Sequence, residues 1–227
     1  MIYVMSDIHG MRDRYEAVLD RIGGLREGDT LYILGDFIDR GPDGISLLQA
    51  VREEKRIVPL IGNHESLALP VLKAIRNGKP PEAIRQTRAW QAWQVNGGEP
   101  TAAAFRALDP EEQDRILEQI EDMGIYREIR VGDRLFHLSH TLPPFDSARP
   151  VHDATFLEFI WGEPDYAVRY DPAVTFITGH VPTVFIDPAF VGRIWQGNGH
   201  VAVDCGASFE GGRLGCLCLE TMEEYYA

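Results

Sequence analysis

Three short apolar runs near the start of the chain each end in a cluster of glycine and polar residues. The runs are Ile2–Met5, Leu31–Leu34 and Ile57–Ile61, and the motifs that follow them are DIHG (7–10), GDFIDRG (35–41) and GNHE (62–65). Helical spacing of apolar residues over Met11–Ile22 and Ile45–Val51 separates the runs. This order predicts a βαβαβ unit, in which parallel strands are joined by right-handed crossovers. Pro59 inside the third run predicts either an edge strand or a position where the chain enters the strand.

The middle of the chain is expected to be helical from residue 64 to about 123. Prolines at 80 and 81 suit a helix N-terminus, and Asp109-Pro110-Glu111-Glu112 combines an Asp cap, a Pro at the first position and acids in the first turn. We expect a single domain over 1–227 with a helical insertion at about 77–123. Trp90, Trp93 and Phe105 in this insertion are expected to form the core of a helical subdomain, with a cap over a functional site as the alternative.

From Ile125 the pattern becomes β-rich, which makes the chain as a whole an α/β protein. One short helix is expected over Ala154–Trp161. The expected strands are Ile129–Val131, Leu135–Ser139, Val174–Thr178, Val191–Trp195, Val201–Asp204 and Leu214–Leu219.

Composition excludes several classes of function. The chain has 227 residues and a formal net charge of −13, which argues against a general nucleic-acid binder and against docking on anionic membranes. Three cysteines without CxxC spacing favour a reduced, cytoplasmic protein. Cys216 and Cys218 are expected to alternate along a strand rather than bind zinc. The N-terminal residues do not resemble a signal peptide, and no apolar run reaches the ~20 residues of a membrane span.

The three motifs place metal-ligating side chains at the ends of consecutive strands. In an open α/β sheet, functional groups gather at the carboxyl ends of parallel strands. Asp7 and His9 point the same way in an extended segment, Asp36 can bridge two ions, and Asn63 offers a neutral oxygen. Two further histidines, His140 and His180, follow the runs ending at Ser139 and Thr178.

These segments resemble those of the metal-dependent serine/threonine phosphoprotein phosphatases, members of the calcineurin-like metallophosphoesterases. The resemblance covers nearly the whole chain and extends to the bacterial and bacteriophage lambda branch through WQVNGG (93–98), SHTLPPFD (139–146), FIWGEP (159–164) and VDCGASFEGG (203–212). It implies a central β-sandwich built on the βαβαβ half with flanking helices.

The resemblance also implies a cofactor of two divalent metal ions. Asp7, His9 and Asp36 would hold the first, and Asp36 would share the second with Asn63, His140 and His180. Manganese is the expected metal, with iron or zinc as alternatives, since the ligands are oxygen and nitrogen without thiolate.

By the same resemblance, a metal-activated hydroxide attacks the phosphorus atom and the remaining motif residues assist. Arg40 clamps the phosphoryl oxygens, and Asn63 and His64 also contact substrate. His64 protonates the leaving alkoxide, and Asp39 orients His64.

Two departures from the family pattern stand out. Ser6 replaces the usual glycine before Asp7, a small change. Relatives carry a second phosphate-binding arginine shortly after the position of Trp161, where this chain has Gly162-Glu163-Pro164-Asp165. Arg169 is the expected replacement and Arg149 the weaker alternative. Glu65 is expected to support Arg40.

The expected function is hydrolysis of phosphomonoesters by a serine/threonine, or dual-specificity, protein phosphatase. Its substrates would be phosphorylated proteins or small phosphomonoesters. The alternative is a nucleotide hydrolase of the symmetrical diadenosine tetraphosphatase type. Those enzymes tend to lose the equivalent of Asp39 and to contain GNHD, whereas this chain keeps Asp39 and has Glu65. A non-catalytic scaffold is disfavoured because all six metal ligands are present.

Overall fold

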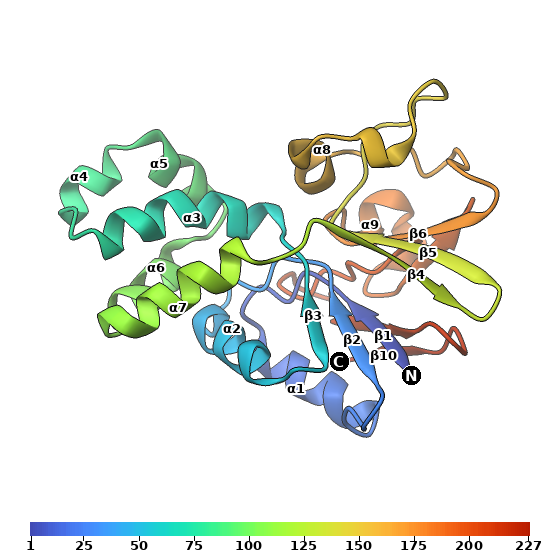
Figure 1. The fold of residues 1–227 in the computed structure, drawn as a ribbon, viewed down its shortest axis with the longest axis horizontal. Helices are drawn as coiled ribbons and strands as arrows, with labels where there is room; N and C mark the ends of the chain where they lie inside the picture. The colour runs from blue at the N-terminus through green and yellow to red at the C-terminus, as the bar shows by residue number, and fades with distance from the viewer.

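Two five-stranded β-sheets stack against each other in the computed structural model, which describes all of residues 1–227 (Figure 1). The first sheet has the order β10-β9-β1-β2-β3. β1 and β2 pair in parallel, as do β2 and β3, whereas β9 pairs antiparallel with β1 and β10. The strand bounds are β1 Ile2–Met5, β2 Thr30–Ile33, β3 Ile57–Pro59, β9 Gly215–Cys218 and β10 Glu224–Tyr226.

The second sheet has the order β4-β5-β6-β8-β7. Its three middle strands run parallel, and the two outer ones pair antiparallel with their neighbours. The bounds are β4 Tyr126–Val131, β5 Arg134–Ser139, β6 Val174–Thr178, β7 Trp195–Gly197 and β8 His200–Ala202. The α/β fold and the β-sandwich expected from the sequence are therefore both confirmed.

Successive side chains of a strand point to opposite faces of its sheet, and this alternation produces two separate hydrophobic cores. Val4 and Leu217 point between the sheets and pack with residues of the second sheet such as Phe136. Their neighbours Met5 and Cys216 point the other way, into the larger core beneath the helices. A strand buried on both faces needs apolar residues at successive positions, which explains the short continuous runs in the sequence.

Helices cover the outer face of the first sheet and extend beyond one side of it (Figure 1). The first two are α1 Arg12–Arg21 and α2 Gly44–Glu53. The expected helical stretch consists of α3 Asn63–Arg76, α4 Pro81–Arg85, α5 Arg88–Val95, α6 Glu99–Arg106 and α7 Pro110–Glu121. The Asp109 side chain accepts a hydrogen bond from the Glu112 amide, as its capping role predicts. α8 Phe156–Trp161 lies over the second sheet, and α9 Thr183–Ile186 follows β6.

One expected strand was wrong, and one strand was not anticipated. Residues 191–194 form no strand, and the strand in this region is β7, which begins at Trp195. A 3-10 turn over Pro188–Phe190 precedes it, and the Arg193 amide bonds back to Phe190, so turn geometry outweighs the apolar pattern of Val191 and Ile194. β10 was not anticipated, because its three residues are too short to show a pattern.

The topology brings two sets of strand ends to one edge of the sandwich. β1, β2 and β3 are parallel in one sheet, and β5, β6 and β8 are parallel in the other. The loops after these strands carry the expected ligands of both halves of the chain.

The three cysteines are buried and unbonded to one another. None of the helices has the length and apolar character needed to cross a bilayer.

Replacing Phe105 by alanine tests whether the helical insertion shares one core with the sheet. Phe105 is fully buried in the cluster that contains Met5 and Leu31 of the sheet. We expect Phe105→Ala to lower the free energy of unfolding by about 3–5 kcal/mol, because it leaves a cavity. Val95→Ala, at a side chain 84% exposed, should change it by less than about 0.5 kcal/mol. Urea unfolding followed by circular dichroism and tryptophan fluorescence is the measurement, and two separate transitions would contradict a shared core.

Candidate metal and phosphate site

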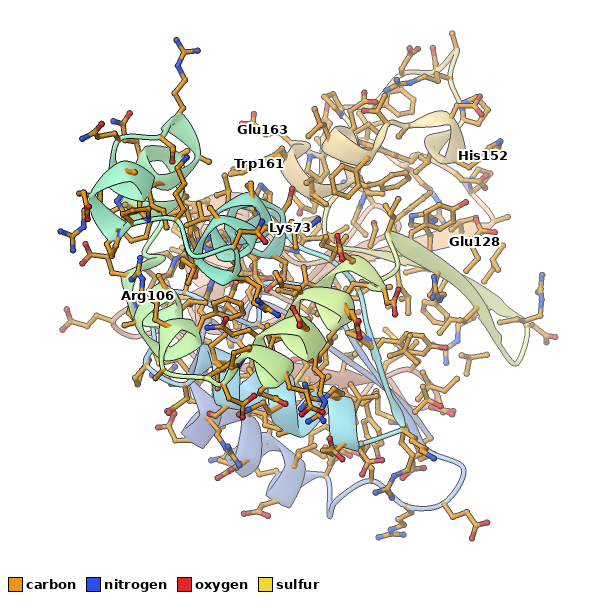
Figure 2. All side chains as sticks on the ribbon, turned by 60° about the vertical axis from the view of Figure 1, so that its left-hand side comes forward. Lys73, Arg106, Glu128, His152, Trp161 and Glu163 are labelled. Carbon is orange, nitrogen blue, oxygen red and sulfur yellow. The ribbon has the colours of Figure 1, made fainter.

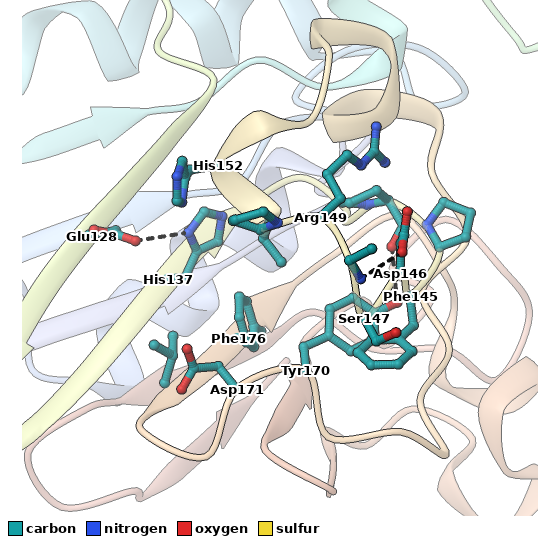
Figure 3. Close-up of a pocket in the computed structure, with 16 residues that line it drawn as sticks. Glu128, His137, Phe145, Asp146, Ser147, Arg149, His152, Tyr170, Asp171 and Phe176 are labelled. Atoms are coloured by element: carbon teal, nitrogen blue, oxygen red, sulfur yellow. Dashed lines mark hydrogen bonds and ion pairs between the residues drawn. The ribbon is translucent and has the colours of Figure 1, made fainter.

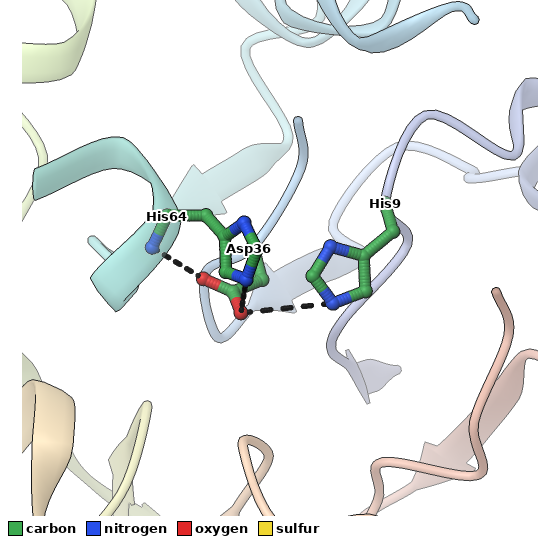
Figure 4. A group of neighbouring side chains, drawn as sticks. All are labelled: His9, Asp36 and His64. Atoms are coloured by element: carbon green, nitrogen blue, oxygen red, sulfur yellow. Dashed lines mark hydrogen bonds and ion pairs between the residues drawn. The ribbon is translucent and has the colours of Figure 1, made fainter. Parts of the chain in front are cut away.

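Asp36 lies at the centre of the site, with three imidazole nitrogens around its carboxylate. Its Oδ2 atom is 3.7 Å from Nε2 of His9 and 3.8 Å from Nε2 of His64 (Figure 4). Its Oδ1 atom is 3.6 Å from Nε2 of His140. Oδ1 also accepts a hydrogen bond from the His64 amide, which fixes the carboxylate in place. One buried carboxylate thus joins ligand groups from both sheets.

Backbone carbonyls set the tautomers of two of these histidines. Nδ1 of His9 donates to the carbonyl of Ile38 at 3.0 Å, and Nδ1 of His140 donates to that of Leu34 at 2.7 Å. A carbonyl only accepts, so each Nδ1 carries a proton, and in the neutral tautomer of each ring Nε2 presents its lone pair toward Asp36. A neutral imidazole held in this way is typical of a metal ligand.

The remaining expected ligands complete the group. Oδ1 of Asn63 lies 2.9 Å from Nε2 of His140 and 3.1 Å from Nδ1 of His180. Oδ1 of Asp7 lies 3.9 Å from Nε2 of His9, and Oδ2 of Asp7 accepts a hydrogen bond from the His180 amide. The structure therefore brings all six expected ligands together.

Burial and mutual interaction shift the pKa values of these groups. Burial raises the pKa of Asp7 to about 6, and it lowers the pKa values of His9 and His180 to about 3. Burial would also raise the pKa of Asp36, but the surrounding histidines outweigh this effect and hold the pKa of Asp36 well below its usual range. The site therefore combines a charged central carboxylate with neutral imidazoles at His9 and His180.

Asp39 is fully buried and fixes His64 through a short network. Its Oδ2 atom lies 2.7 Å from Nδ1 of His64 and accepts a second hydrogen bond from Nε1 of Trp93 at 2.7 Å. Its Oδ1 atom accepts from the Thr101 hydroxyl at 2.7 Å. Burial opposes the charged form of His64, yet Asp36 and the bond to Asp39 outweigh it and raise the pKa of His64 to about 9.

Arg40 is exposed beside His64, at the rim of a cleft whose lining also includes Asp36 and Asn63. One terminal nitrogen is 3.3 Å from Nε2 of His64, and the other donates to the Ser208 hydroxyl at 3.2 Å. The guanidinium carbon lies 5.3 Å from the centre of the Phe209 ring. The Arg40 amide donates to the carbonyl of Gly97, so the helical insertion also fixes this residue.

Glu65 is fully buried and holds the loop that carries Asp36. Its Oε2 atom accepts hydrogen bonds from the amides of Asp36 and Gly62, at 2.9 and 3.0 Å. Its Oε1 atom accepts from the amides of Phe37 and Ile38, at 2.9 and 3.4 Å. Burial raises the pKa of Glu65 to about 7, but a proton on either oxygen would displace one of these amide donors.

The expectation that Glu65 supports Arg40 was wrong. Both Glu65 oxygens are occupied by backbone amides of the loops after β2 and β3. Its role in this structure is to clamp two strand-end loops together, and Arg40 is held by Gly97 and Ser208 instead.

The backbone at the site adopts a conformation that side chains normally avoid. Eight residues other than glycine have positive φ angles, and six of them are expected site residues: Asp7, His9, Asp36, Asp39, Arg40 and His180, with φ between 49° and 72°. Such residues cluster at functional sites, where the surrounding structure enforces the strain.

Two glycines allow the strand-end loops to approach this closely. A Cβ atom on Gly35 would lie 2.5 Å from the amide nitrogen of Gly62, and its φ is +91°. A Cβ atom on Gly62 would lie 2.2 Å from Oδ1 of Asp36. Any side chain at either position would push the central carboxylate out of place.

Comparison with known protein families agrees with this geometry. The model of the calcineurin-like phosphoesterases matches residues 1–184, which is most of the chain. The chain belongs to the calcineurin-like phosphoesterase family. Members of this family use a dinuclear centre of divalent metal ions.

Curated proteins named symmetrical bis(5'-nucleosyl)-tetraphosphatases are among the relatives of this phosphoesterase. A symmetrical bis(5'-nucleosyl)-tetraphosphatase of Wigglesworthia glossinidia brevipalpis is 34% identical over 85 residues, which cover 37% of this chain and 31% of the relative. A second one, of Delftia acidovorans, is 29% identical over 134 residues, 58% of this chain and 40% of the relative. The chain thus matches less than half of each relative's length.

Solved structures share the fold at low sequence identity. One described as a candidate diadenosine tetraphosphatase has a TM-score of 0.69 at 16% identity, over all of this chain and 92% of the other. A protein serine/threonine phosphatase from Saccharomyces cerevisiae has a TM-score of 0.62 at 15% identity, over 95% of this chain and 71% of the other. Both likenesses concern the fold alone.

The donor set of this phosphoesterase fits two divalent metal ions. Two groups of three residues each bring their potential ligand atoms within 4.8 Å of one another. One group is His9, Asp36 and His64, and the other is Asp36, His140 and His180. Asp36 belongs to both. Nε2 of His140 and Oδ1 of Asn63 face each other as two acceptors, an arrangement that a cation between them would stabilise.

The structure does not bring either candidate for a second phosphate-binding arginine to the cleft. The Arg169 guanidinium donates to the carbonyls of Asp171 and Pro172 in its own loop, and it does not line the cleft. Arg149 forms an ion pair with Glu158. The expectation for Arg169 therefore finds no support in the geometry, because local carbonyls already bind its donors.

Several residues that shape the site were not singled out from the sequence. Trp93 and Thr101 bind Asp39. From the sequence, Trp93 was expected only as a core residue and as part of the WQVNGG segment, and Thr101 was not marked. Asp204, in the VDCGASFEGG segment, is buried, and burial raises its pKa well above the usual range. Residues that line the cleft without having been expected there are Asn96, Trp161, Pro182, Phe185 and Phe209.

A larger cavity lies away from the site, on the outer side of the second sheet. Its volume is about 580 Å³, and the loop over residues 143–152 forms one wall (Figure 3). Of the residues considered for the site from the sequence, it contains only Arg149, the weaker arginine candidate. Burial lowers the pKa of His137 in its lining to about 4, and this ring packs against Tyr126 and Phe159, which also stack on each other. His137 therefore acts as a neutral packing residue.

Two substitutions at Arg40 test the backbone strain. Arg40 has a φ of +66° and an exposed side chain, so removing the side chain leaves no buried cavity. Arg40→Gly should be more stable than Arg40→Ala by about 1 kcal/mol, because only glycine adopts this conformation freely. Chemical denaturation of both variants is the measurement. Equal stability, or a more stable alanine variant, would contradict a strained Arg40.

Proposed function

We propose that this phosphoesterase hydrolyses dinucleoside polyphosphates at a centre of two divalent metal ions. In this proposal Asp7, His9 and Asp36 hold one ion, and Asp36, Asn63, His140 and His180 hold the other. The observation that carries the metal centre is Asp36, whose two oxygens each face imidazole nitrogens at 3.6–3.8 Å. The names of the curated relatives carry the choice of substrate. Manganese is the proposed metal, with iron or zinc as alternatives, because no thiolate is among the donors.

When bound, such ions activate water and neutralise charge on the phosphoryl oxygens. The protein's own residues do the rest. Arg40, at the rim, is proposed to bind the phosphoryl oxygens through its exposed guanidinium. The Ser208 hydroxyl accepts a hydrogen bond from that guanidinium, and the Gly97 carbonyl accepts one from the Arg40 backbone amide, so little conformational freedom is lost when substrate binds.

His64 is proposed to hold the proton that the leaving oxygen receives. Its Nδ1 is bonded to Asp39, so the proton available to substrate is on Nε2, which faces Asp36 and Arg40. Trp93 and Thr101 hold Asp39, and Asp39 thereby acts as a positioning residue for His64.

The proposed substrate, a dinucleoside polyphosphate, differs from the phosphorylated protein that the sequence motifs favoured. Asp39 and Glu65 pointed to a protein phosphatase, whereas the curated relatives carry the name of nucleotide hydrolases. A protein phosphatase remains the second candidate, because the intact pair of Asp39 and His64 suits a poor leaving group such as a serine alkoxide. A nucleoside diphosphate is a better leaving group and depends less on this pair.

A direct comparison of substrates tests the proposal. Diadenosine tetraphosphate, a phosphoserine peptide and a phosphotyrosine peptide would be assayed side by side with manganese, and again after chelation. We expect the highest kcat/KM on diadenosine tetraphosphate, with two molecules of ADP as products, and no turnover after chelation. A higher kcat/KM on either peptide would replace the proposal by the second candidate, and full turnover in metal-free protein would overturn the metal centre.

Variants of His64 and Arg40 separate their roles. His64→Asn should reduce turnover of a phosphoserine peptide by about 10²–10⁴-fold, because the alkoxide must be protonated. It should affect p-nitrophenyl phosphate much less, since nitrophenolate leaves without a proton. Arg40→Ala should reduce kcat/KM by a similar factor on both substrates, because both present phosphoryl oxygens. Metal content is measured in each variant. An equal loss on both substrates for His64→Asn would show that His64 is not the proton donor.

A further inference from the structure

An apolar cavity adjoins the phosphate cleft on the side of α9. It has a volume of about 250 Å³ and lies between α9 and the loop over residues 205–212. The cleft itself has about 220 Å³, and the two spaces share Pro182, Phe185 and Phe209 in their linings. Together they reach the roughly 300–1,000 Å³ of small-molecule sites, which neither reaches alone.

Phe185 and Phe209 stand between the two spaces with their rings uncovered. Phe185 is 76% exposed and Phe209 is 46% exposed. In the free protein these two large aromatic rings remain exposed to water and lack the stabilisation that burial gives. A planar ligand ring packed against them would supply it. Phe209 also touches the phosphate-binding end of the site, because the Arg40 guanidinium carbon is 5.3 Å from its centre.

The backbone that presents Phe185 is held in place. The Thr183 amide donates to the carbonyl of Asp204 at 2.9 Å, and the Thr183 hydroxyl donates to that of Phe190 at 3.0 Å. Thr183 is buried, and these bonds anchor the start of α9, which follows shortly after the proposed ligand His180 in the sequence. The ring of Phe185 therefore extends from a fixed support beside the metal-ligand segment.

The charges in the cavity exclude a second phosphate group. Its lining contains no lysine or arginine, and Glu210 is its only acidic residue. Glu210 makes no ion pair, so its carboxylate is free to accept a hydrogen bond. An anion would be repelled here, whereas a neutral ring with an amino group matches both the apolar walls and the free acceptor.

We propose that this cavity binds the nucleobase of a nucleotide whose phosphates occupy the metal and Arg40 side of the cleft, with the base stacked on Phe185 and Phe209. This assignment rests on the proposed function and adds the residues that select a nucleotide over other phosphate esters. Aromatic stacking suits every base, so the site discriminates by the presence of a base more than by its identity.

The test measures inhibition by ADP and by pyrophosphate, with p-nitrophenyl phosphate as the reporter substrate. ADP carries a base and pyrophosphate does not. Phe185→Ala should raise the inhibition constant of ADP about tenfold, the loss of one stacking partner, and leave that of pyrophosphate unchanged. Phe185→Tyr keeps the ring and should restore the wild-type value. Leu157→Ala on α8, at a side chain 61% exposed that lines neither space, is the matched control and should change neither constant.

Diadenosine tetraphosphate provides the second measurement. Phe185→Ala should raise its KM by a similar factor with little change in kcat. If Phe185→Ala leaves the ADP constant unchanged, or moves the pyrophosphate constant equally, the nucleobase site is overturned. A KM increase confined to a phosphotyrosine peptide would also overturn it and assign the cavity to a peptide side chain. If the ADP pattern holds while the wild-type enzyme cleaves no dinucleotide, the proposed function fails and the base site stands.

Discussion

The carboxylate of Glu65 is the interaction on which the rest of the site depends. It accepts hydrogen bonds from four backbone amides in two loops that belong to different strands. An uncompensated buried carboxylate would be strongly destabilising, so these amides and Glu65 require each other. The clamp fixes the amide of Asp36, and Asp36 in turn faces histidines from three separate segments. Precision at the centre of the site therefore begins with a residue that contacts no substrate.

Much of the fold could be predicted from the sequence because its signals are local. The runs Ile2–Met5 and Val174–Thr178 match strands residue for residue, and of the two positions expected from Pro59, the edge strand is confirmed by β3. The failures have equally local causes. Val191–Trp195 is apolar but follows a 3-10 turn, and β10 is too short to show any periodicity. Pairing partners across the sandwich, such as β1 with β9, depend on tertiary contacts that no single segment encodes.

The candidate site likewise has features that the sequence predicts and features that it does not. Its six proposed metal ligands follow strands. The rule that strand ends meet at one edge predicted the grouping of the three motifs of the first sheet, and the family resemblance added His140 and His180. Glu65 and Arg169 show the limit of that rule. Glu65 bonds to backbone amides, and the Arg169 donors are taken by nearby carbonyls, neither of which a motif reveals. Trp93 and Thr101 reach Asp39 from 54 and 62 residues away, a distance over which spacing carries no information.

The network around Asp39 divides the site between two parts of the structure. Trp93 and Thr101 come from short helices of eight residues each, whereas the metal-ligand loops are fixed by strands and by Glu65. Short helices open locally more readily than strands at the centre of a sheet. Warming would therefore free Asp39 and loosen His64 while the ligand loops stay in register. Hydrolysis of esters with poor leaving groups would decline first, so temperature would narrow the range of substrates before it abolished turnover.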